Sequence, residues 1–308
     1  MRISDEVTKN IIKKLLKGED YRIEVVTLLN TRFFDHIRNF LSLIPERKKK
    51  LLKTLKENDL DFEKLFLSKI LNLKSKELMI NSGLNKKTIS NMYNTAVEKT
   101  VIEASNKNFQ SLKKILGGLD EQDEINVNLS VEFKDQEITQ NFDLKDFLFI
   151  VNALAVKRAE LRGGLWSAAG KRVEKPLMLT LCKIFGVKDS NYHSDDQVDE
   201  GTDFSRETDF YLINKDKKYK CEVKLMGKGN PESADAFYAR DSHVFIADKL
   251  SNTNIKQLDH NSVQWVQLRS KNGFKRFEKV LKKLKIKFSG FKKDYEKNLD
   301  KYFEEIFN

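Results

Sequence analysis

The feature that most constrains this sequence is a change in the spacing of its apolar residues near residue 120. Before that point apolar residues recur every three or four positions, and between residues 125 and 133 they alternate strictly with polar ones. The first spacing is typical of helices that bury one face, and the second of a half-buried strand. The sequence therefore predicts a large helical N-terminal part, with roughly four to six helices, followed by a part that contains strands.

Breaks in the first part are expected at Pro45 with the charged run 46–50, and at Gly117-Gly118. Residues 76–94, KELMINSGLNKKTISNMYN, look like a helix-turn-helix whose second helix is anchored by Ile89 and Met92. Its polar residues can reach base edges and phosphates from the major groove: Asn85, Lys86, Lys87, Thr88, Ser90 and Asn91. An ordinary helix pair with a glycine turn would look the same, so that alternative stays open.

The second part mixes helices and strands. A β-hairpin is expected over residues 125–142. A helix over 144–161 is expected to stop at Arg162-Gly163-Gly164, and another over 167–185 at Gly186, while the acidic stretch 188–207 is expected to be a loop. Four strands are then expected: 209–213, 219–225, 243–247 and 263–268. A helix that begins near 231 and another at 254–259 separate the later strands, and the chain is expected to be helical again after Gly273. This order indicates an α/β or α+β fold with a mixed central sheet flanked by helices.

Charge and cysteine content limit the class of partner and the compartment. The net charge of +11 and the pI near 9.3 favour a polyanion, with nucleic acid ahead of an anionic membrane surface. No stretch reaches the roughly 18 apolar residues of a membrane span, and the N-terminus lacks a signal-peptide pattern, so we expect a cytoplasmic protein. Cys182 and Cys221 lie in separate apolar runs and are expected to be reduced and buried.

Charged residues at the ends of the strands 209–213 and 219–225 form the candidate site. Residues two apart on a strand share a face, so Glu222 and Lys224 should project together while Val223 projects into the core and still offers its carbonyl. The turn between the strands can bring Asp209 alongside Glu222. Two carboxylates and a carbonyl suit Mg²⁺, for which Mn²⁺ can substitute, and the nearby ammonium can position an attacking water. Asp203 is the rival of Asp209.

On these residues, the segment 167–268 resembles the PD-(D/E)xK nuclease superfamily, and specifically the type II restriction endonucleases. The motif SAAGKRVEKPLM resembles the helix that precedes the hairpin in that family and supplies a further glutamate, here Glu174. The resemblance implies that Asp209 and Glu222 are metal ligands, Lys224 is the catalytic lysine and Glu174 is a supporting ligand. Thr208 departs from the family pattern, which has proline before the aspartate. The alternative is a surface hairpin with a solvated cluster of charges.

Other basic residues are candidate DNA contacts. Lys228 and Asn230 precede a predicted helix start and can bind a backbone phosphate, although an ordinary capped helix explains them equally well. Lys171 lies near the predicted active helix, together with Arg162 and Arg172. The C-terminal lysines are expected to form a solvated face: Lys282, Lys283, Lys285 and Lys287. The four histidines show no metal-ligand spacing, no nucleotide-binding motif is present, and Trp166 and Trp265 are expected in the core.

The resemblance implies a type II restriction endonuclease of a restriction–modification system, which hydrolyses double-stranded DNA site-specifically and leaves 5′-phosphate and 3′-hydroxyl ends. A homodimer is expected, because a palindromic site cut on both strands needs two active centres. The expected domains are a helical domain (1–120), a β-hairpin junction (121–143), a nuclease core (144–270) and C-terminal helices (271–308). The alternatives are a repair or recombination nuclease of the same fold and a non-catalytic helix-turn-helix regulator.

Overall fold

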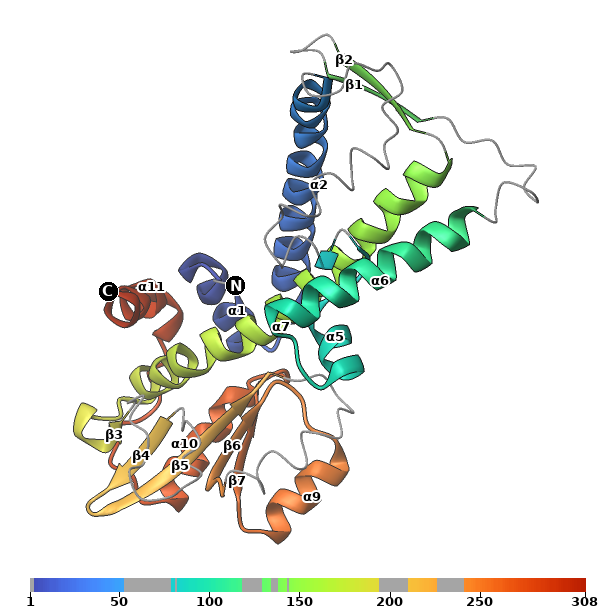
Figure 1. Ribbon diagram of the computed structural model, residues 1–308. Helices are drawn as coiled ribbons and strands as arrows, with labels where there is room; N and C mark the ends of the chain where they lie inside the picture. Colours follow the sequence, from blue (N-terminus) through green and yellow to red (C-terminus); the bar gives the residue numbers. More distant parts are fainter. Residues whose placement is uncertain are drawn as a thin grey trace. The chain divides into compact units, whose positions relative to one another are not determined.

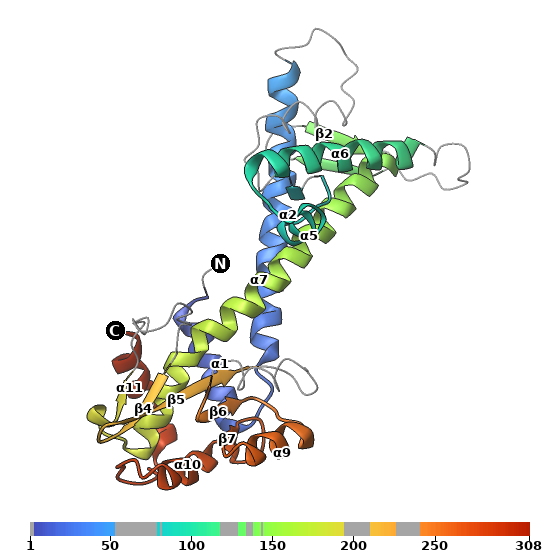
Figure 2. The same ribbon diagram turned by 60° about the horizontal axis from the view of Figure 1, so that its bottom comes forward.

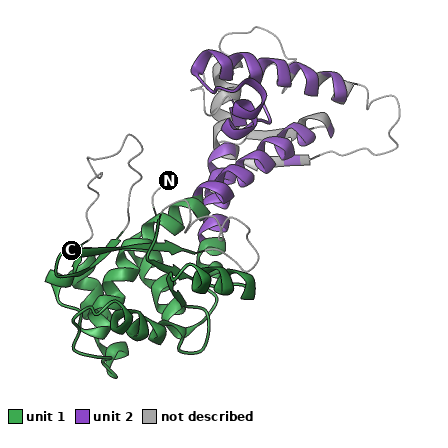
Figure 3. Cartoon of the chain, turned by 90° about the horizontal axis from the view of Figure 1, so that it is seen from below, with its two compact units in different colours: residues 1–27, 165–308 green, residues 28–164 purple. Residues whose placement is uncertain are grey.

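The computed structural model describes residues 3–52, 79–80, 82–117, 129–133, 138–142, 144–193, 210–225 and 241–308. The chain forms two compact units, which Figure 3 distinguishes by colour: unit 1 contains residues 1–27 and 165–308, and unit 2 contains residues 28–164. Unit 1 is therefore assembled from both ends of the chain. The domain boundaries at 120, 143 and 270 separate segments by their expected functions, and they remain a prediction.

Unit 1 is built on a five-stranded sheet with the order β3-β4-β5-β6-β7 (Figure 1). The pairs β3–β4 and β4–β5 are antiparallel, and the pairs β5–β6 and β6–β7 are parallel. The predicted mixed sheet is thus confirmed. Its strands are β3 (Tyr192–His193), β4 (Phe210–Asn214), β5 (Lys217–Lys224), β6 (Val244–Ala247) and β7 (Gln264–Gln267).

The hairpin β4–β5 forms as the sequence predicts. Phe210 pairs with Cys221 and Asn214 with Lys217, which leaves a two-residue turn at Lys215-Asp216. Lys215 has a left-handed backbone with a φ of 53°, a conformation common in tight hairpin turns. In β4, Phe210 and Leu212 are buried alternately, whereas in β5 the three consecutive residues Cys221, Glu222 and Val223 are buried, so the end of β5 lies inside the protein on both faces.

Short helices pack on the parallel side of the sheet. Helix α9 (Asn252–His260) lies beside β7 in Figures 1 and 2, and its Leu258 joins Phe245 and Ala247 in one apolar cluster. The 3₁₀ helix η4 (Gly273–Arg276) and helix α10 (Phe277–Lys283) also contact β7. The helical prediction after Gly273 is therefore confirmed, and it includes α11 (Tyr295–Phe307).

Helix α7 (Leu144–Phe185) corrects the prediction of two separate helices. It continues through Gly163-Gly164, because a glycine inside a helix costs only about 1 kcal/mol relative to alanine and the flanking Leu161 and Leu165 are buried. The predicted end at Gly186 is confirmed. Gly186 has a φ of 64°, and the next backbone N–H, of Val187, donates to the carbonyl of Cys182 at 2.9 Å.

The stretch predicted to be a loop after Gly186 contains some regular structure. Asp189–Asn191 form a 3₁₀ turn (η3), and Tyr192–His193 form β3. The reason is tertiary, since Tyr192 pairs with Leu212 and its ring stacks on Phe210 at a centroid distance of 5.5 Å. Residues 194–207, the rest of this stretch, lie outside the described residues.

The N-terminal helices are α1 (Asp5–Lys17) and α2 (Arg22–Leu52). Ser4 caps α1, and Gly18, with a φ of 75°, ends it. The predicted break at Pro45 is wrong, because α2 continues past it; a proline removes one backbone donor, which can bend a helix without ending it. None of the helices that the structure describes has the length and apolar content of a membrane span.

Unit 2 also contains α5 (Lys86–Tyr93), α6 (Glu98–Gly117) and a two-stranded antiparallel sheet of β1 (Leu129–Phe133) and β2 (Ile138–Phe142). The sheet confirms the predicted hairpin, and α6 ends at Gly117 as expected. Alternation and glycine signals are local, which is why the sequence alone located both features.

Candidate active site

The last three residues of β5 place two charged side chains on one side of the strand and an apolar one on the other. Lys224 Nζ lies 2.6 Å from Glu222 Oε1, and Val223 is fully buried. The predicted common face of Glu222 and Lys224 is confirmed. Glu222 is only 2% exposed, so its carboxylate is held among packed atoms beside an ammonium group, unlike the charges of a solvated surface hairpin.

Helix α7 brings a second carboxylate to the same lysine. Glu174 is 7% exposed, and its Oε1 lies 3.9 Å from Lys224 Nζ. Residues 50 positions apart in the sequence, on a helix and on a strand, therefore meet at one ammonium group. We call Glu174, Glu222 and Lys224 the carboxylate–lysine cluster. It offers buried carboxylate oxygens, which are donors that hard divalent cations accept.

Several predicted site residues lie outside the described residues: Asp203, Asp209, Lys228 and Asn230. Asp209 directly precedes Phe210, the first residue of β4, and Phe210 pairs with Cys221, the neighbour of Glu222. Within the described part of the chain, no three His, Cys, Asp or Glu side chains are grouped so that they could hold a metal ion. The carboxylate–lysine cluster contains two carboxylates, those of Glu174 and Glu222.

A second group of charged residues, which the sequence analysis did not single out, lies at the carboxyl ends of β6 and β7. Asp248 follows β6 and is fully buried. Arg269 Nη1 lies 3.9 Å from Asp248 Oδ2 and 3.3 Å from Asp20 Oδ1. We call Asp20, Asp248 and Arg269 the Asp248 cluster. Burial raises the pKa of the Asp248 carboxyl to about 6, although the Lys249 N–H and Arg269 act in the opposite direction.

The short connection between α1 and α2 contacts the end of β5. The Tyr21 hydroxyl donates to the carbonyl of Leu225, which follows Lys224, at 3.0 Å. Arg22 Nε donates to Asp20 Oδ1 at 2.8 Å, and this hydrogen bond lowers the pKa of Asp20. Charged residues directly after apolar strands at the carboxyl end of a parallel sheet are a general signal of a site, and that signal could have drawn attention to Asp248 and Arg269.

In unit 2, the candidate DNA-contact helix α5 has an apolar anchor and a polar exterior. Asn85 caps it by accepting from the Thr88 N–H at 3.0 Å, and Ile89 is fully buried. The predicted DNA contacts on it are all at least partly exposed: Lys86, Lys87, Thr88 and Asn91. Met92 was predicted to anchor the helix and is instead 60% exposed, because Tyr93 occupies the inward position four residues after Ile89.

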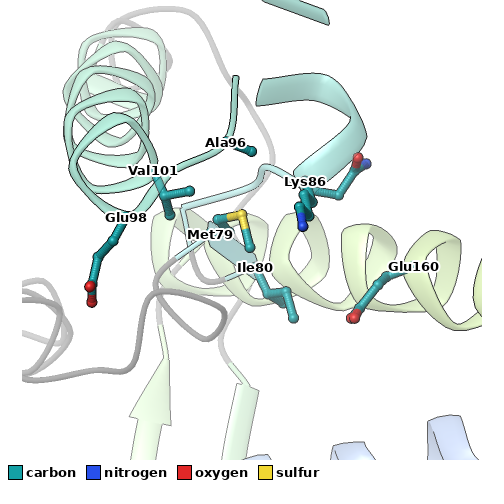
Figure 4. Close-up of a pocket in the computed structure, with 8 residues that line it drawn as sticks. Met79, Ile80, Lys86, Ala96, Glu98, Val101 and Glu160 are labelled. Carbon is teal, nitrogen blue, oxygen red and sulfur yellow. The ribbon is translucent and has the colours of Figure 1, made fainter. Parts of the chain in front are cut away.

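A cavity of about 410 Å³ lies beside the first turn of α5 (Figure 4). Met79 and Val101 give it apolar walls, and Lys86 and Glu160 add opposite charges. Glu160 also forms an ion pair with Lys157 at 2.9 Å. One of the predicted DNA-contact lysines thus lines a cavity as well as the exterior of the helix.

The remaining basic candidates differ in their surroundings. Lys171 is exposed on α7, one turn before Glu174, whereas Arg172 is paired with Asp5 at 2.5 Å. Lys282 pairs with Glu278 one helical turn away and the other C-terminal lysines are exposed, as expected for a solvated face.

The tryptophans and cysteines test two further predictions. Trp166 and Trp265 are half-buried rather than part of the core; Trp265 lies on the edge strand β7, where the Arg276 guanidinium covers its ring at 3.5 Å. Both cysteines are unbridged and buried, as predicted.

Comparison with known proteins gives the chain a family. Neither the curated proteins nor the solved structures that were compared with it gave a match. The CfrBI restriction endonuclease family matches residues 5–255, which is well over half of the chain and includes Glu174, Glu222 and Lys224. The chain therefore belongs to the CfrBI restriction endonuclease family and is a type II restriction endonuclease, a site-specific deoxyribonuclease.

Proposed function

We propose that this chain cleaves both strands of a specific double-stranded DNA sequence in a Mg²⁺-dependent reaction, and that Glu222, Lys224, Glu174 and Asp209 form its active site on a PD-(D/E)xK core. The observation that carries the proposal is the contact of 2.6 Å between the Lys224 ammonium and a Glu222 carboxylate that is 2% exposed. Burying a charge is costly unless a partner compensates it, so such a pair at a strand end is typical of a functional site.

The donor atoms of this site fit Mg²⁺ in kind. Glu222 and Asp209 would be the carboxylate ligands, the Val223 carbonyl a neutral ligand and Glu174 a supporting ligand, with Mn²⁺ as a substitute ion. Two of these carboxylates already face one ammonium group, Glu222 at 2.6 Å and Glu174 at 3.9 Å. When bound, the divalent ion would neutralise the charge that develops on the phosphate during hydrolysis.

The protein's own groups would orient the reactants. Lys224 has three donors on its ammonium group, and one of them can hold the attacking water while another stays on Glu222. Glu174, whose Oε1 lies 3.9 Å from the ammonium, would limit the positions that Lys224 can adopt. Attack on the phosphorus atom and departure of the 3′ oxygen would leave a 5′-phosphate and a 3′-hydroxyl.

DNA binding would involve the exposed basic and polar residues outside the active site. Lys86, Lys87, Thr88 and Asn91 on α5 would contact the DNA major groove, and Lys171, Lys228 and Asn230 the backbone near the cut. In this scheme the helical segment 1–120 serves recognition and dimerisation, and segment 144–270 is the nuclease core. A two-fold homodimer would place one active centre on each strand of a palindromic site.

Replacing the lysine tests the proposal. Lys224→Ala should lower the cleavage rate about 100- to 1000-fold in Mg²⁺, since removal of one electrostatic group in an active site costs on the order of 2.7–4 kcal/mol. DNA affinity measured in Ca²⁺ should stay within about twofold. Lys218→Ala, an exposed lysine on the same strand, is the matched control and should cleave normally. Cleavage by Lys224→Ala at the normal rate would refute the assignment.

The choice of DNA substrate distinguishes a restriction endonuclease from a repair or recombination nuclease of the same fold. Uniform fragments from intact plasmid, with identical sequences at every end, are expected for site-specific cleavage. A repair or recombination nuclease of the same fold would cut only at lesions or branches, and that result would contradict the proposal. Family membership supports an enzyme over a non-catalytic regulator.

A further inference from the structure

Lys224 is the last residue of β5, and backbone pairing with β6 fixes its position in the sheet. In the parallel part of the sheet Lys224 pairs with Ala247, and Ala247 with Gln267. The backbone hydrogen bonding continues beyond these pairs. The Asp248 N–H donates to the Lys224 carbonyl at 3.4 Å, and the Arg269 N–H donates to the Asp248 carbonyl at 2.8 Å. The backbone of Asp248 therefore connects Lys224 with Arg269 at the edge of the site.

A contribution to folding stability does not account well for a buried carboxylate at Asp248. It is fully buried, its Oδ1 accepts the Lys249 N–H at 2.8 Å, and among the described residues no donor forms a hydrogen bond to Oδ2. The nearest cation, Arg269 Nη1, is 3.9 Å away. A buried ion pair with such geometry is often less stabilising than apolar residues of similar size, so a positional role accounts better for its presence.

Arg269 connects this carboxylate with the connection between α1 and α2. Its Nη1 lies 3.3 Å from Asp20 Oδ1, and Asp20 is in turn held by Arg22. Tyr21 lies between these two residues, is 2% exposed, and donates its hydroxyl hydrogen to the Leu225 carbonyl at 3.0 Å. Ion pairs thus hold Asp20 and Arg22, the two neighbours of Tyr21 in the chain. The Tyr21 hydroxyl in turn holds the backbone of Leu225, the residue after Lys224.

We propose that Tyr21 is a positioning residue of the active site, which fixes the backbone at Leu225 so that the Lys224 ammonium stays against Glu222, and that the Asp248 cluster holds Tyr21 in place. A lysine side chain has four rotatable bonds, so the place of its ammonium group depends on where the strand ends and in which direction the chain leaves it. This inference rests on the proposed function, in which Lys224 is catalytic.

The variant Tyr21→Phe removes one hydroxyl and leaves the ring. The cleavage rate in single turnover, with saturating DNA and Mg²⁺, should fall about 10- to 100-fold, because small displacements of a reacting group cost that much. DNA affinity in Ca²⁺ should not change. The matched control is Tyr295→Phe in α11, which also removes a hydroxyl that donates to a neighbour, Glu296, at 3.0 Å and should cleave at the normal rate.

A purely structural role of the hydroxyl would lower the melting temperature and leave the rate of the folded enzyme unchanged. A normal single-turnover rate for Tyr21→Phe would therefore overturn the proposal. Should that variant fail to fold, Asp20→Asn decides, because Asp20 is 47% exposed and the change removes the charge that pairs with Arg269. A several-fold slower rate with normal DNA affinity supports the proposal, and a normal rate refutes it.

The variant Lys224→Ala distinguishes failure of the positioning role of Tyr21 from failure of the proposed function. Normal cleavage by Lys224→Ala would refute the catalytic assignment itself. Loss of cleavage in Lys224→Ala, together with a normal rate in Tyr21→Phe, would refute only the positioning role.

Discussion

The end of β5 in unit 1 and the first turns of α5 in unit 2 use charge in opposite ways. At the end of β5 Glu222 is only 2% exposed and Glu174 of α7 only 7%, and both carboxylates lie within 4 Å of the Lys224 ammonium. On α5 the buried residue is Ile89, and the lysines Lys86 and Lys87 are exposed. Buried charges have fixed positions, which chemistry needs, whereas exposed charges can adjust to a long polyanion.

The strongest test of this comparison replaces each carboxylate by its neutral isostere. Glu222→Gln should lower the cleavage rate about 1000-fold, since the metal-ligand role proposed for Glu222 would contribute several kcal/mol to charge stabilisation. Glu174→Gln should cost about 10- to 100-fold, as expected of a supporting residue farther from the ammonium. Single-turnover rates in Mg²⁺ measure both. Equal losses would show that the two carboxylates have the same role.

A pH titration tests whether the buried charges of unit 1 are costly. The pKa of Asp248 is raised to about 6 from an ordinary value of 3.8, so its burial favours the folded state below pH 4, and this stability is lost as the pH rises through 6. The free energy of unfolding of Asp248→Asn relative to the unchanged protein should therefore rise by about 2–3 kcal/mol between pH 4 and 7. A constant difference in denaturant unfolding would contradict the assigned pKa.

Exposed lysines of unit 2 should act through salt-dependent affinity alone. The double change Lys86→Ala with Lys87→Ala should weaken DNA binding on the order of 10-fold and reduce the slope of log K against log salt by about 2, because each lost phosphate contact removes about one counterion. The single-turnover rate with saturating DNA should stay normal. A matched pair, Lys282→Ala with Lys285→Ala, should leave the slope unchanged. An unchanged slope in the α5 variant would remove α5 from the DNA interface.

The sequence was informative where structure is decided locally. The hairpin β4–β5 follows from alternation around a short charged turn, and the common face of Glu222 and Lys224 follows from the two-residue repeat of a strand. The continuation of α7 through Gly163-Gly164 was missed, because the buried leucines on both sides outweigh the glycine penalty. Tertiary contacts override local propensity in such cases.

The Asp248 cluster could not be assembled from the sequence, because its members come from distant segments. Asp20 lies between two N-terminal helices, whereas Asp248 and Arg269 end strands more than 200 residues later. Only the parallel order of β5, β6 and β7 brings the ends of these strands to one edge. A single sequence does not specify that order.

The two buried thiols have a practical consequence. Cys182 and Cys221 are the only cysteines of the chain, and burial raises the pKa of each thiol, so neither should react with alkylating or fluorescent reagents in the folded protein. A cysteine introduced at an exposed position would then carry the label by itself. Probes for fluorescence or spin-label measurements on DNA complexes can thus be attached without first removing the native cysteines.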